Sequence, residues 1–572
     1  MVETTHPGRR AGGRHRISFA RMARAIVSPV LAVAALLVAL LALPLSENNL
    51  LSIPFGATVI VGLSLLTFLW SRRIAFSIYS ALAIVAIVTI VSALKYKLKG
   101  FSLHFYDAVA MAGDAEMYRF LLSSYLHVVG PVLVAAFAAI GLLALLYRLD
   151  RPRALPLRVR AMLVAAPAVL LPLTLPNEAV ANQRYFYYLL GRHTTAFFVS
   201  LLDVGNLFGR SDLEARLAQM PPEPAFSGAA DCGSGDRPDV FLVLAESQTD
   251  PTIFPQIASA ETIAAGMEAA AGPLQPLQVE TFGGGTWISN LSLMTGLSAT
   301  DFGWRSPYLT ISLENGVKAS LPEIFARCGY RTAAILPLDY SFVNEGPFLS
   351  SIGFETVLDK DDIGASHYHL RDSFYLDAAA AFAARHRAED GRPLFLLIQT
   401  MFAHSPYNER MEPDLQPQAA ALDADPEVDE YLRRMAIANN DLGAFMRATV
   451  GGEERRSVMV TFGDHQAFVT KPFVEALAGE NALADPTSLA YRTFYAIAGA
   501  EPAAADAAPI DIAFLGNRVL EAAGLGGNDL FRDLARLERL CGGRFHLCPH
   551  RSEIDRHLKR RVDSGMLRLD GG

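Results

Sequence analysis

The sequence predicts two parts: an N-terminal domain of five transmembrane helices, then an α/β domain whose mostly parallel sheet is covered by helices on both faces. Two observations support this prediction. The 572-residue chain is 51% hydrophobic, and its long uncharged runs lie in the first third, which is typical of membrane proteins. From about residue 215 onward, buried-strand patterns alternate with helical patterns, which is typical of a large α/β core.

Five uncharged runs are candidate membrane spans, at residues 25–46, 48–71, 74–94, 120–147 and 161–177. The first four are long enough to cross a hydrocarbon core of about 30 Å at about 1.5 Å per residue. The fifth is shorter and contains Pro167, Pro172 and Pro176, so a buried core helix is the alternative for it. We therefore predict a transmembrane domain over residues 25–177.

The distribution of arginine predicts the orientation of the chain. Arginines crowd the tail at residues 1–24 and the loops that follow the second and fourth runs. By the positive-inside rule the tail is cytoplasmic, and five spans then place the rest of the chain outside; Lys95, Lys97 and Lys99 run against this pattern. The expected location is the cell inner membrane, crossed several times, with the second domain facing the periplasm or exterior.

A linker rich in Pro, Gly and Ala precedes the second domain, which we place at residues 237–572. Residues 178–236 hold this linker and an amphipathic stretch at 185–208, and a similar stretch lies at 101–122. Both are expected at the membrane surface, and a helical linker packed on the second domain is the alternative for 185–208. Apolar runs typical of fully buried strands occur at 239–245, 332–336, 394–399 and 457–462, with helical patterns at 319–328, 373–386 and 428–448. Ligand sites in such folds lie beyond the carboxyl ends of the strands.

Polar residues with suitable chemistry follow three of these strands. Glu246 follows the first, His404 the third, and Asp464 with His465 the fourth. A carboxylate and an imidazole on adjacent residues can both turn toward one metal ion if the backbone bends at Gly463. Taken singly, such residues more often cap strands or have structural roles. Their occurrence together at the strand ends of one domain indicates a functional site.

Thr286 opens a helical pattern directly after Gly283, Gly284 and Gly285. Glycines allow close backbone approach, and N–H groups at a helix N-terminus favour a phosphate. A bound divalent cation could deprotonate the Thr286 hydroxyl for attack on phosphorus. The alternative is a plain N-cap after a flexible turn. A Walker loop is excluded because no lysine follows the glycines.

Glu246, Thr286, His404 and the Asp464–His465 pair together resemble the site of the lipoteichoic acid synthase and phosphoglycerol transferase family. This family is a branch of the alkaline phosphatase superfamily with a sulfatase-like domain, and the resemblance covers the whole chain because the family also has five spans. It implies that Glu246, Thr286, Asp464 and His465 bind one divalent metal ion and that His404 belongs to the substrate site. Mn²⁺ is the expected metal, with Mg²⁺ and Zn²⁺ as alternatives for such a mixed site.

The resemblance also implies a ping-pong reaction. Thr286 attacks the head-group phosphate of a phospholipid such as phosphatidylglycerol, diacylglycerol leaves, and an external glycan or lipid acceptor takes the group from Thr286. His404 could bind a phosphate oxygen or protonate the leaving group. A phosphoethanolamine transferase or a metal-dependent phosphodiesterase of the same superfamily is the alternative, since each shares these residues.

The chain departs from the family at residues 341–345. The lipoteichoic acid synthases have a Ser-Phe-Trp-Asn-Arg stretch that contacts glycerol phosphate, whereas this chain has Ser-Phe-Val-Asn-Glu. Glu345 in place of the arginine reverses a charge beside an expected phosphate and removes a bidentate contact, which argues against a poly(glycerol phosphate) polymerase. The candidates for substrate contacts are therefore Trp304, Arg305, Asn344 and Arg371.

Several other function classes fit the sequence poorly. A net charge of −8 without a basic stripe excludes a nucleic-acid partner. No cysteine lies in the motif that sulfatases convert to formylglycine, and His367 and His369 form no pattern of further zinc ligands. A membrane sensor with a degenerate enzyme domain is disfavoured because all five site residues are retained. The four cysteines all lie in the domain predicted to be external, where disulfides are permitted, and their pairing is open.

Overall fold

The computed structural model describes residues 28–569, apart from residue 100, parts of 112–125, and 177–188, 202–211, 418–424, 451–454 and 501–507. The chain divides into two compact units. The first comprises Met1–Ala93, Leu126–Val180 and Gly191–Val199, and the second comprises Leu94–Tyr125, Ala181–Leu190 and Ser200–Gly572. The loop between the third and fourth predicted spans therefore belongs to the second unit.

The first unit is helical. Its helices are α2 (Pro29–Ala42), α3 (Ile53–Ser71), α4 (Ile74–Lys99), α7 (Leu126–Leu149), α8 (Leu157–Leu173) and α10 (His193–Ser200). Three described helices are long and apolar enough to cross a membrane, at Leu50–Ser71, Ile74–Lys97 and Val129–Leu149. They correspond to the second, third and fourth predicted spans.

The first and fifth predicted spans are shorter helices. The apolar helix Pro29–Leu45 begins where the described residues begin. Helix α8 has 17 residues, with Arg158 and Arg160 near its start and Pro167 and Pro172 inside it. A total of five crossings therefore stays a prediction. Within the two stretches expected at the membrane surface, the described helices are α5 (Phe105–Met111) and α10, and much of the remainder lies outside the described residues.

The second unit is built on one eight-stranded sheet in the order β4-β3-β5-β1-β6-β7-β2-β8. Strands β4, β3, β5, β1 and β6 are parallel, β7 is antiparallel to both β6 and β2, and β8 is parallel to β2. The strands are β1 (Asp239–Ala245), β2 (Gln275–Gln278), β3 (Arg331–Ile335), β4 (Thr356–Leu358), β5 (Leu394–Gln399), β6 (Ser457–Gly463), β7 (Arg492–Ala498) and β8 (Ile510–Asp511). The predicted mostly parallel sheet is confirmed, and the predicted strands at 239–245 and 394–399 coincide with β1 and β5.

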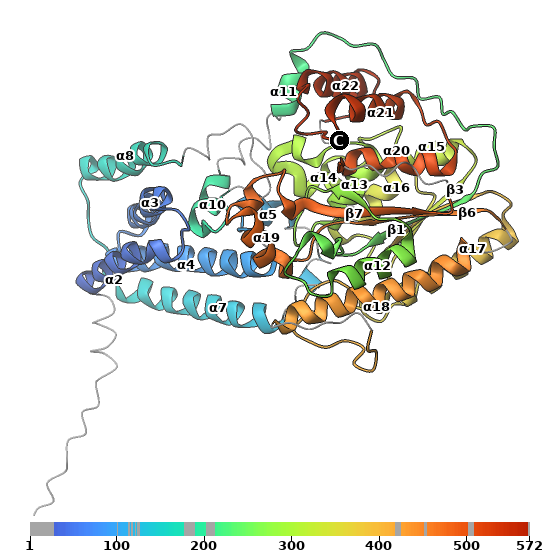
Figure 1. The fold of residues 1–572 in the computed structure, drawn as a ribbon. Coiled ribbons are helices and arrows are strands. Elements are labelled where there is room, and N and C mark those ends of the chain that lie inside the picture. Colours follow the sequence, from blue (N-terminus) through green and yellow to red (C-terminus); the bar gives the residue numbers. More distant parts are fainter. Residues whose placement is uncertain are drawn as a thin grey trace, which may run out of the picture. The chain divides into compact units, whose positions relative to one another are not determined.

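Helices cover both faces of this sheet (Figure 1). One face packs against α12 (Ala260–Ala271), α17 (Asp372–Glu389) and α18 (Pro426–Thr449). The other packs against helices that include α13 (Thr286–Thr295), α15 (Leu321–Arg327) and α20 (Ile512–Ala523). All residues of β1, β5 and β6 are buried because both faces are covered.

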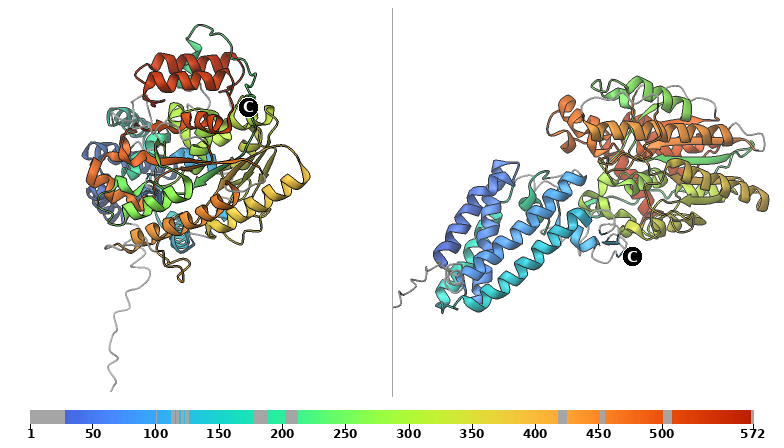
Figure 2. Two further views of the ribbon diagram at one scale, coloured as in Figure 1. Left: turned by 45° about the vertical axis from the view of Figure 1, so that its right-hand side comes forward. Right: turned by 90° about the horizontal axis from the view of Figure 1, so that it is seen from below.

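Shorter helices complete the second unit: α11 (Asp212–Ala218), α14 (Leu309–Ser312), α16 (Glu345–Ser351), α19 (Lys471–Ala478), α21 (Asp529–Cys541) and α22 (Arg551–Asp563). Helices α21 and α22 lie side by side (Figure 2), joined by the Arg536–Glu553 ion pair. Two disulfides, Cys232–Cys328 and Cys541–Cys548, use all four cysteines. The pairing left open by the sequence is thereby assigned.

Candidate active site

Three potential metal ligands meet at the carboxyl ends of two adjacent strands. Glu246 follows β1, and Asp464 and His465 follow β6, whose last residue Gly463 pairs with Ala245. All three side chains are buried, and their ligand atoms lie within 4.8 Å of one another. A Cβ atom on Gly463 would lie 2.1 Å from the carbonyl oxygen of Gln248, so the two strand ends approach closely because this residue is glycine.

The orientation of His465 suits a metal ligand. Its Nδ1 lies 3.0 Å from the carbonyl oxygen of Gln466, so the proton is assigned to Nδ1, which donates to that oxygen. The other nitrogen, Nε2, lies 3.2 Å from Asp464 Oδ2 and 3.7 Å from Glu246 Oε1. An imidazole held in this way through one nitrogen presents the other as a ligand.

Thr286 is the first residue of α13 and contacts this cluster directly. Its hydroxyl donates a hydrogen bond of 3.2 Å to Glu246 Oε2. The preceding glycines all have positive φ, and Gly283 N–H donates to the carbonyl of Gln466 at 2.9 Å. This bond joins the glycine loop to the segment that carries His465. The predicted helix start at Thr286 is thus observed, and its side chain faces the predicted ligands.

Two serines that the sequence did not single out, Ser247 and Ser289, hold Glu246 and Asp464 in place. The main-chain N–H of Ser247 donates to Asp464 Oδ1 at 2.8 Å, and its hydroxyl donates to Glu246 Oε1 at 2.8 Å. The Ser289 hydroxyl donates to the main-chain oxygen of Asp464 at 2.6 Å. Ser289 follows Thr286 by three residues, so helical spacing puts both on one face of α13. That spacing is the signal that could have identified it.

Burial opposes the ionised form of both carboxyl groups. It raises the pKa of Glu246 to about 7, with the neighbouring Asp464 adding to the effect, and it raises the pKa of Asp464 to about 6. Asp464 Oδ2 is buried and forms no hydrogen bond within the described residues. A divalent cation would compensate both charges and take this oxygen as a ligand. The residues present therefore fit one divalent cation bound by carboxylate oxygens and an imidazole nitrogen.

His404 lies in the turn after β5, with other aromatic residues. Its ring centroid is 5.8 Å from that of His369 and 5.9 Å from that of Tyr368. Arg434 on α18 donates to the main-chain oxygen of His404 at 3.0 Å. Tyr407 of the same segment packs against Tyr431, whose hydroxyl donates to the carbonyl of Ser247 at 2.8 Å. The His404 segment is thus fastened to the loop that follows β1.

The four candidates for substrate contacts make contacts within the protein. The Trp304 ring lies 5.2 Å from that of Tyr106, and Arg305 pairs with Glu214 at 3.3 Å. Asn344 donates to the main-chain oxygen of Thr310 and to Glu314, both at 2.9 Å. Arg371 forms a bidentate ion pair with Asp441. No hydrogen bond or ion pair within the described residues joins any of these four to Glu246, Thr286, Asp464 or His465, and a substrate role for them stays a prediction.

Glu345 occupies a different environment from the one that the sequence suggested. Its buried carboxyl accepts hydrogen bonds from Asn290 Nδ2 at 2.8 Å and from Gln399 Nε2 at 2.9 Å. Burial raises its pKa. Asn290 lies on α13 and Gln399 ends β5, so Glu345 joins three elements beside the candidate site. Asn290 and Gln399 carry no pattern from which this contact could be predicted.

The family of the chain follows from a comparison with family models. The sulfatase model matches residues 238–525, which is half of the chain and contains Glu246, Thr286, His404, Asp464 and His465. The chain belongs to the sulfatase family. The predicted sulfatase-like domain of the alkaline phosphatase superfamily is therefore confirmed. All four cysteines of this family member are in disulfides, so none is available as a formylglycine precursor.

Two curated relatives are 24% identical to this sulfatase-family chain. One, an uncharacterized protein from Haemophilus influenzae, aligns over 322 residues, which are 54% of this chain and 57% of the relative. The other, a putative cyclic beta-1,2-glucan modification protein from Rhizobium meliloti, aligns over 255 residues, which are 43% of this chain and 38% of the relative. The chain thus spans about half or less of the length of these relatives.

Two solved structures are similar to this chain to different extents. The integral membrane protein lipooligosaccharide phosphoethanolamine transferase A from Neisseria meningitidis matches with a TM-score of 0.52 at 12% identity, covering 89% of this chain and 97% of that one. The phosphoglycerol transferase GacH from Streptococcus pyogenes, solved with sn-glycerol-1-phosphate, matches with a TM-score of 0.44 at 15% identity, covering 58% and 87%. The first match extends over both units of the chain.

Proposed function

We propose that this protein is a membrane-bound phosphotransferase that moves a phosphoglycerol-type head group from phosphatidylglycerol to an external glycan or lipid acceptor. The observation that carries the proposal is the Thr286 hydroxyl, which opens a helix and donates to Glu246 beside the buried Asp464–His465 pair. Membership of the sulfatase family and the fold shared with a membrane transferase support it. The relative named for glucan modification favours a glycan as the acceptor.

The chain's own residues account for the steps of the transfer. Thr286 Oγ1 forms a bond to phosphorus, the bond from phosphorus to the diacylglycerol oxygen breaks, and Glu246 Oε2, 3.2 Å from the hydroxyl, is placed to accept its proton. The N-terminus of α13 offers N–H groups and partial positive charge to the phosphate. A divalent cation held by Glu246, Asp464, His465 and the Thr286 oxygen would stabilise developing negative charge and favour the ionised hydroxyl.

The second half of the transfer regenerates the enzyme. An acceptor hydroxyl attacks the phosphorus on Thr286, and the Thr286 oxygen leaves and regains the proton that Glu246 held. The proton of the acceptor passes to His404, which gave one to the diacylglycerol oxygen in the first half. His404, whose main-chain oxygen accepts a hydrogen bond from Arg434, protonates the diacylglycerol oxygen in the first half of this scheme or binds a phosphate oxygen. The product is a phosphodiester on the acceptor, and the donor is released as diacylglycerol.

Intact-protein mass spectrometry tests the proposal. The full chain is mixed with phosphatidylglycerol vesicles and Mn²⁺ without acceptor, and a phosphoglycerol adduct on Thr286 is expected. Thr286→Ala removes the nucleophile, so the adduct disappears and turnover falls by about 10³-fold or more, while the metal ligands remain. Turnover in Thr286→Ala above that of metal-free protein would contradict the mechanism.

A phosphoethanolamine transferase is the second candidate, favoured by the fold match over 89% of the chain to an enzyme with that activity. The same experiment separates the two. A phosphoethanolamine adduct, formed with phosphatidylethanolamine vesicles and absent with phosphatidylglycerol, would assign this second function. Release of a free head group without any adduct would assign a phosphodiesterase.

A further inference from the structure

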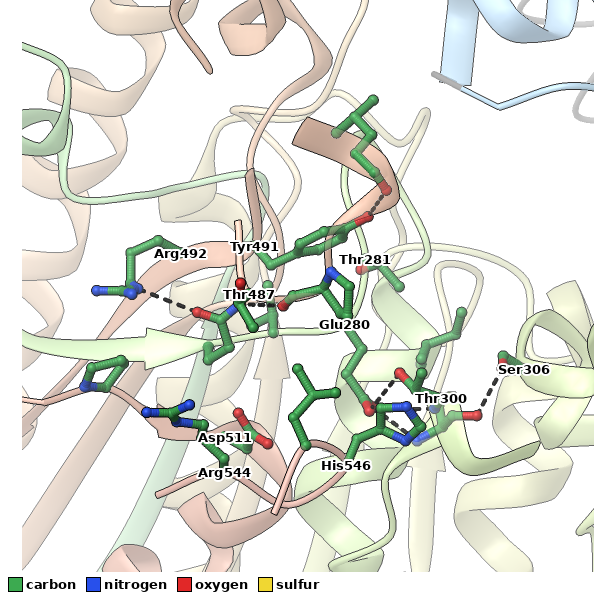
Figure 3. A pocket seen from close by; sticks show the side chains of 18 of the residues that line it. Glu280, Thr281, Thr300, Ser306, Thr487, Tyr491, Arg492, Asp511, Arg544 and His546 are labelled. Carbon is green, nitrogen blue, oxygen red and sulfur yellow. Dashed lines mark hydrogen bonds between the residues drawn. The ribbon is translucent and has the colours of Figure 1, made fainter. Parts of the chain in front are cut away.

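A pocket of about 410 Å³ lies beside the nucleophile loop but is distinct from the candidate metal site. It is lined by residues from five segments, near Glu280, Thr300, Tyr491, Asp511 and His546 (Figure 3). Its volume is within the range of small-molecule sites. Thr281 and Ile288, on either side of Thr286 in the sequence, line its wall, whereas Glu246, Thr286, Asp464 and His465 do not.

The pocket opens at the same edge of the sheet as the metal site. Gln278, at the carboxyl end of β2, pairs with Arg492, which begins the antiparallel strand β7, and with Asp511 of β8. Strands β6 and β7 are adjacent, so the pocket extends this edge sideways from Asp464. The main-chain oxygen of Arg492 also accepts a hydrogen bond of 2.8 Å from Gln466, the residue after His465. A ligand in this pocket therefore lies close to the reacting centre.

Two arginines that form no ion pair within the described residues line the pocket. Arg492 is half-buried and its Nε donates to Gln278 at 3.3 Å, but neither Arg492 nor Arg544 forms an ion pair within the described residues. Burial lowers the pKa of Arg492, as expected of a cation without a counter-ion. A half-buried guanidinium that faces a pocket without a carboxylate partner is suited to an anionic ligand.

The two acidic side chains in the wall offset these cations only in part, because the oxygens of Glu280 are already hydrogen-bonded within the protein and Asp511 is partly protonated. Glu280 is occupied by donors from residues 292–300, which include Ser292 at 2.7 Å and the main-chain N–H of Ala299 at 2.9 Å. Asp511 accepts the main-chain N–H of Phe545 at 2.5 Å, and burial raises its pKa to about 7. Asp511 therefore carries only part of a negative charge near neutral pH.

A neutral hydrogen-bonding group and an apolar wall complete the pocket. Thr281 is buried, and its hydroxyl has no hydrogen-bond partner within the described residues. A buried hydroxyl without a partner costs free energy unless a ligand or water satisfies it. Val279, Ile288, Leu483 and Pro509 provide apolar surface. The pocket thus combines cations, hydroxyls and an apolar face, which matches a polyol that bears a phosphate.

We infer that this pocket binds the phosphate-bearing, hydroxyl-rich group of the acceptor that receives the head group from Thr286. The inference rests on the proposed function, because it names the acceptor of that reaction. Arg492 and Arg544 bind the anion, Thr281 bonds to a hydroxyl, and the apolar wall packs against carbon atoms. The acceptor is accordingly an already phosphorylated glycan or polyol rather than a neutral one.

Calorimetric titration tests this assignment without turnover. The full-length Thr286→Ala protein, in detergent and with chelator so that the metal site binds no phosphate, is titrated with glycerol phosphate and with glycerol. Glycerol phosphate is expected to bind and glycerol is not. Arg492→Gln and Arg544→Gln should each weaken binding by about tenfold or more, since each removes a charge-assisted hydrogen bond. Thr281→Val should weaken it several-fold.

The controls keep the outcome interpretable. Arg544 is exposed, so its substitution leaves folding intact even if Arg492→Gln does not fold. Arg385→Gln removes an exposed arginine elsewhere and should bind glycerol phosphate normally. Binding that is unchanged in Arg544→Gln and Thr281→Val, or absent at millimolar ligand, would overturn the inference.

Two further ligands identify the source of the anion. Equal affinity for inorganic phosphate would show that the pocket binds the anion alone, and preference for phosphatidylglycerol vesicles would assign it to a lipid head group; either result overturns the acceptor assignment. The adduct experiment on the wild-type protein decides the proposed function separately. An adduct without binding in this pocket rejects the inference alone, whereas binding without an adduct rejects the transfer mechanism.

Discussion

At the scale of single residues, the candidate site depends on side chains that hold ligands as much as on the ligands themselves. Ser247 and Ser289 bond to the Asp464 carboxylate and to its main-chain oxygen, respectively, and Ser247 also bonds to Glu246. Because burial disfavours both carboxylates when ionised, the two donors of Ser247 offset part of that cost before any cation binds. Such supporting bonds fix the geometry of a metal site.

Ser289→Ala tests this support. The substitution leaves the buried main-chain oxygen of Asp464 without its 2.6 Å donor, which costs about 1–3 kcal/mol. We expect a lower Tm and about 10-fold weaker Mn²⁺ binding, measured by calorimetry. Ser341→Ala, an exposed position at which the side chain caps no helix, is the matched control. Equal Mn²⁺ affinity in both variants would show that Ser289 has no part in positioning the ligand.

At the scale of elements, one buried carboxyl joins α13, α16 and β5. Glu345 accepts from amide groups of Asn290 and Gln399, so the residue that interrupts the family pattern stabilises the helix that carries Thr286. An arginine at this position would place its own N–H donors against the side-chain N–H donors of Asn290 and Gln399. The local departure from the family therefore fits the surrounding side chains of this chain.

Restoring the family's arginine should consequently destabilise the protein. Glu345→Arg buries a cation against two donors, and an unpaired buried charge costs about 3–5 kcal/mol. Glu345→Gln keeps an acceptor oxygen between Asn290 and Gln399 and should cost less. Thermal unfolding followed by circular dichroism measures the difference. A Glu345→Arg protein as stable as Glu345→Gln would mean that this position is open to solvent or substrate.

The N-terminus of α17 predicts a pH dependence of stability. Asp372 Oδ1 accepts the main-chain N–H groups of Met401 and Phe402, which lead to His404, and burial raises the Asp372 pKa to about 7. The folded protein thus retains a proton that the unfolded chain releases above about pH 4. The contribution of Asp372 to the free energy of unfolding is therefore fully present below about pH 4 and is lost as the pH rises to about 7.

Asp372→Asn should reduce the loss of stability that the wild-type protein shows as the pH rises. Both N–H groups bond to one oxygen, which asparagine retains, and the variant has no charge to bury. Its Tm should fall less than that of the wild type between pH 5 and pH 8, as measured by thermal scans in chelator. Asp377→Asn, exposed on the same helix, should follow the wild type. Parallel curves for Asp372→Asn and the wild type would contradict the assignment.

The same elements show what could be predicted from the sequence. Strands β1 and β5 coincide with their apolar runs because both of their faces are buried, which gives a continuous pattern. Strand β2 (Gln-Pro-Leu-Gln) and the two-residue β8 have no such pattern. They are strands because β2 pairs with β7 and β8 pairs with β2. Glu246, Thr286 and Asp464 follow apolar runs or glycines and were predicted. Asn290 and Gln399 gain their contacts with Glu345 from tertiary packing alone, whereas Ser289 has one signal in the sequence, its three-residue spacing from Thr286.

At the scale of the whole molecule, two disulfides reinforce the second unit. Cys232 and Cys328 are separated by 96 residues and Cys541 and Cys548 by 7. On chain entropy alone, closing these loops contributes about 4.7 and about 2.4 kcal/mol, respectively. The longer loop joins the segment before β1 to the end of α15. Disulfides persist in oxidising compartments, so their presence bears on which side of the membrane this unit occupies.

Thiol labelling of intact cells therefore tests the predicted orientation. With the basic tail inside and an odd number of crossings, the second unit is external and all four cysteines are oxidised, so maleimide should label the wild-type chain only after reduction. Cys328→Ser leaves the half-buried Cys232 without its partner and should be labelled without reduction, which shows that the reagent reaches this unit. If the wild-type protein is labelled fully without reduction, and only after the cells are permeabilised, the second unit lies in the cytoplasm. That result would also remove an external acceptor from the proposed reaction, because Thr286 would then face the wrong side of the membrane.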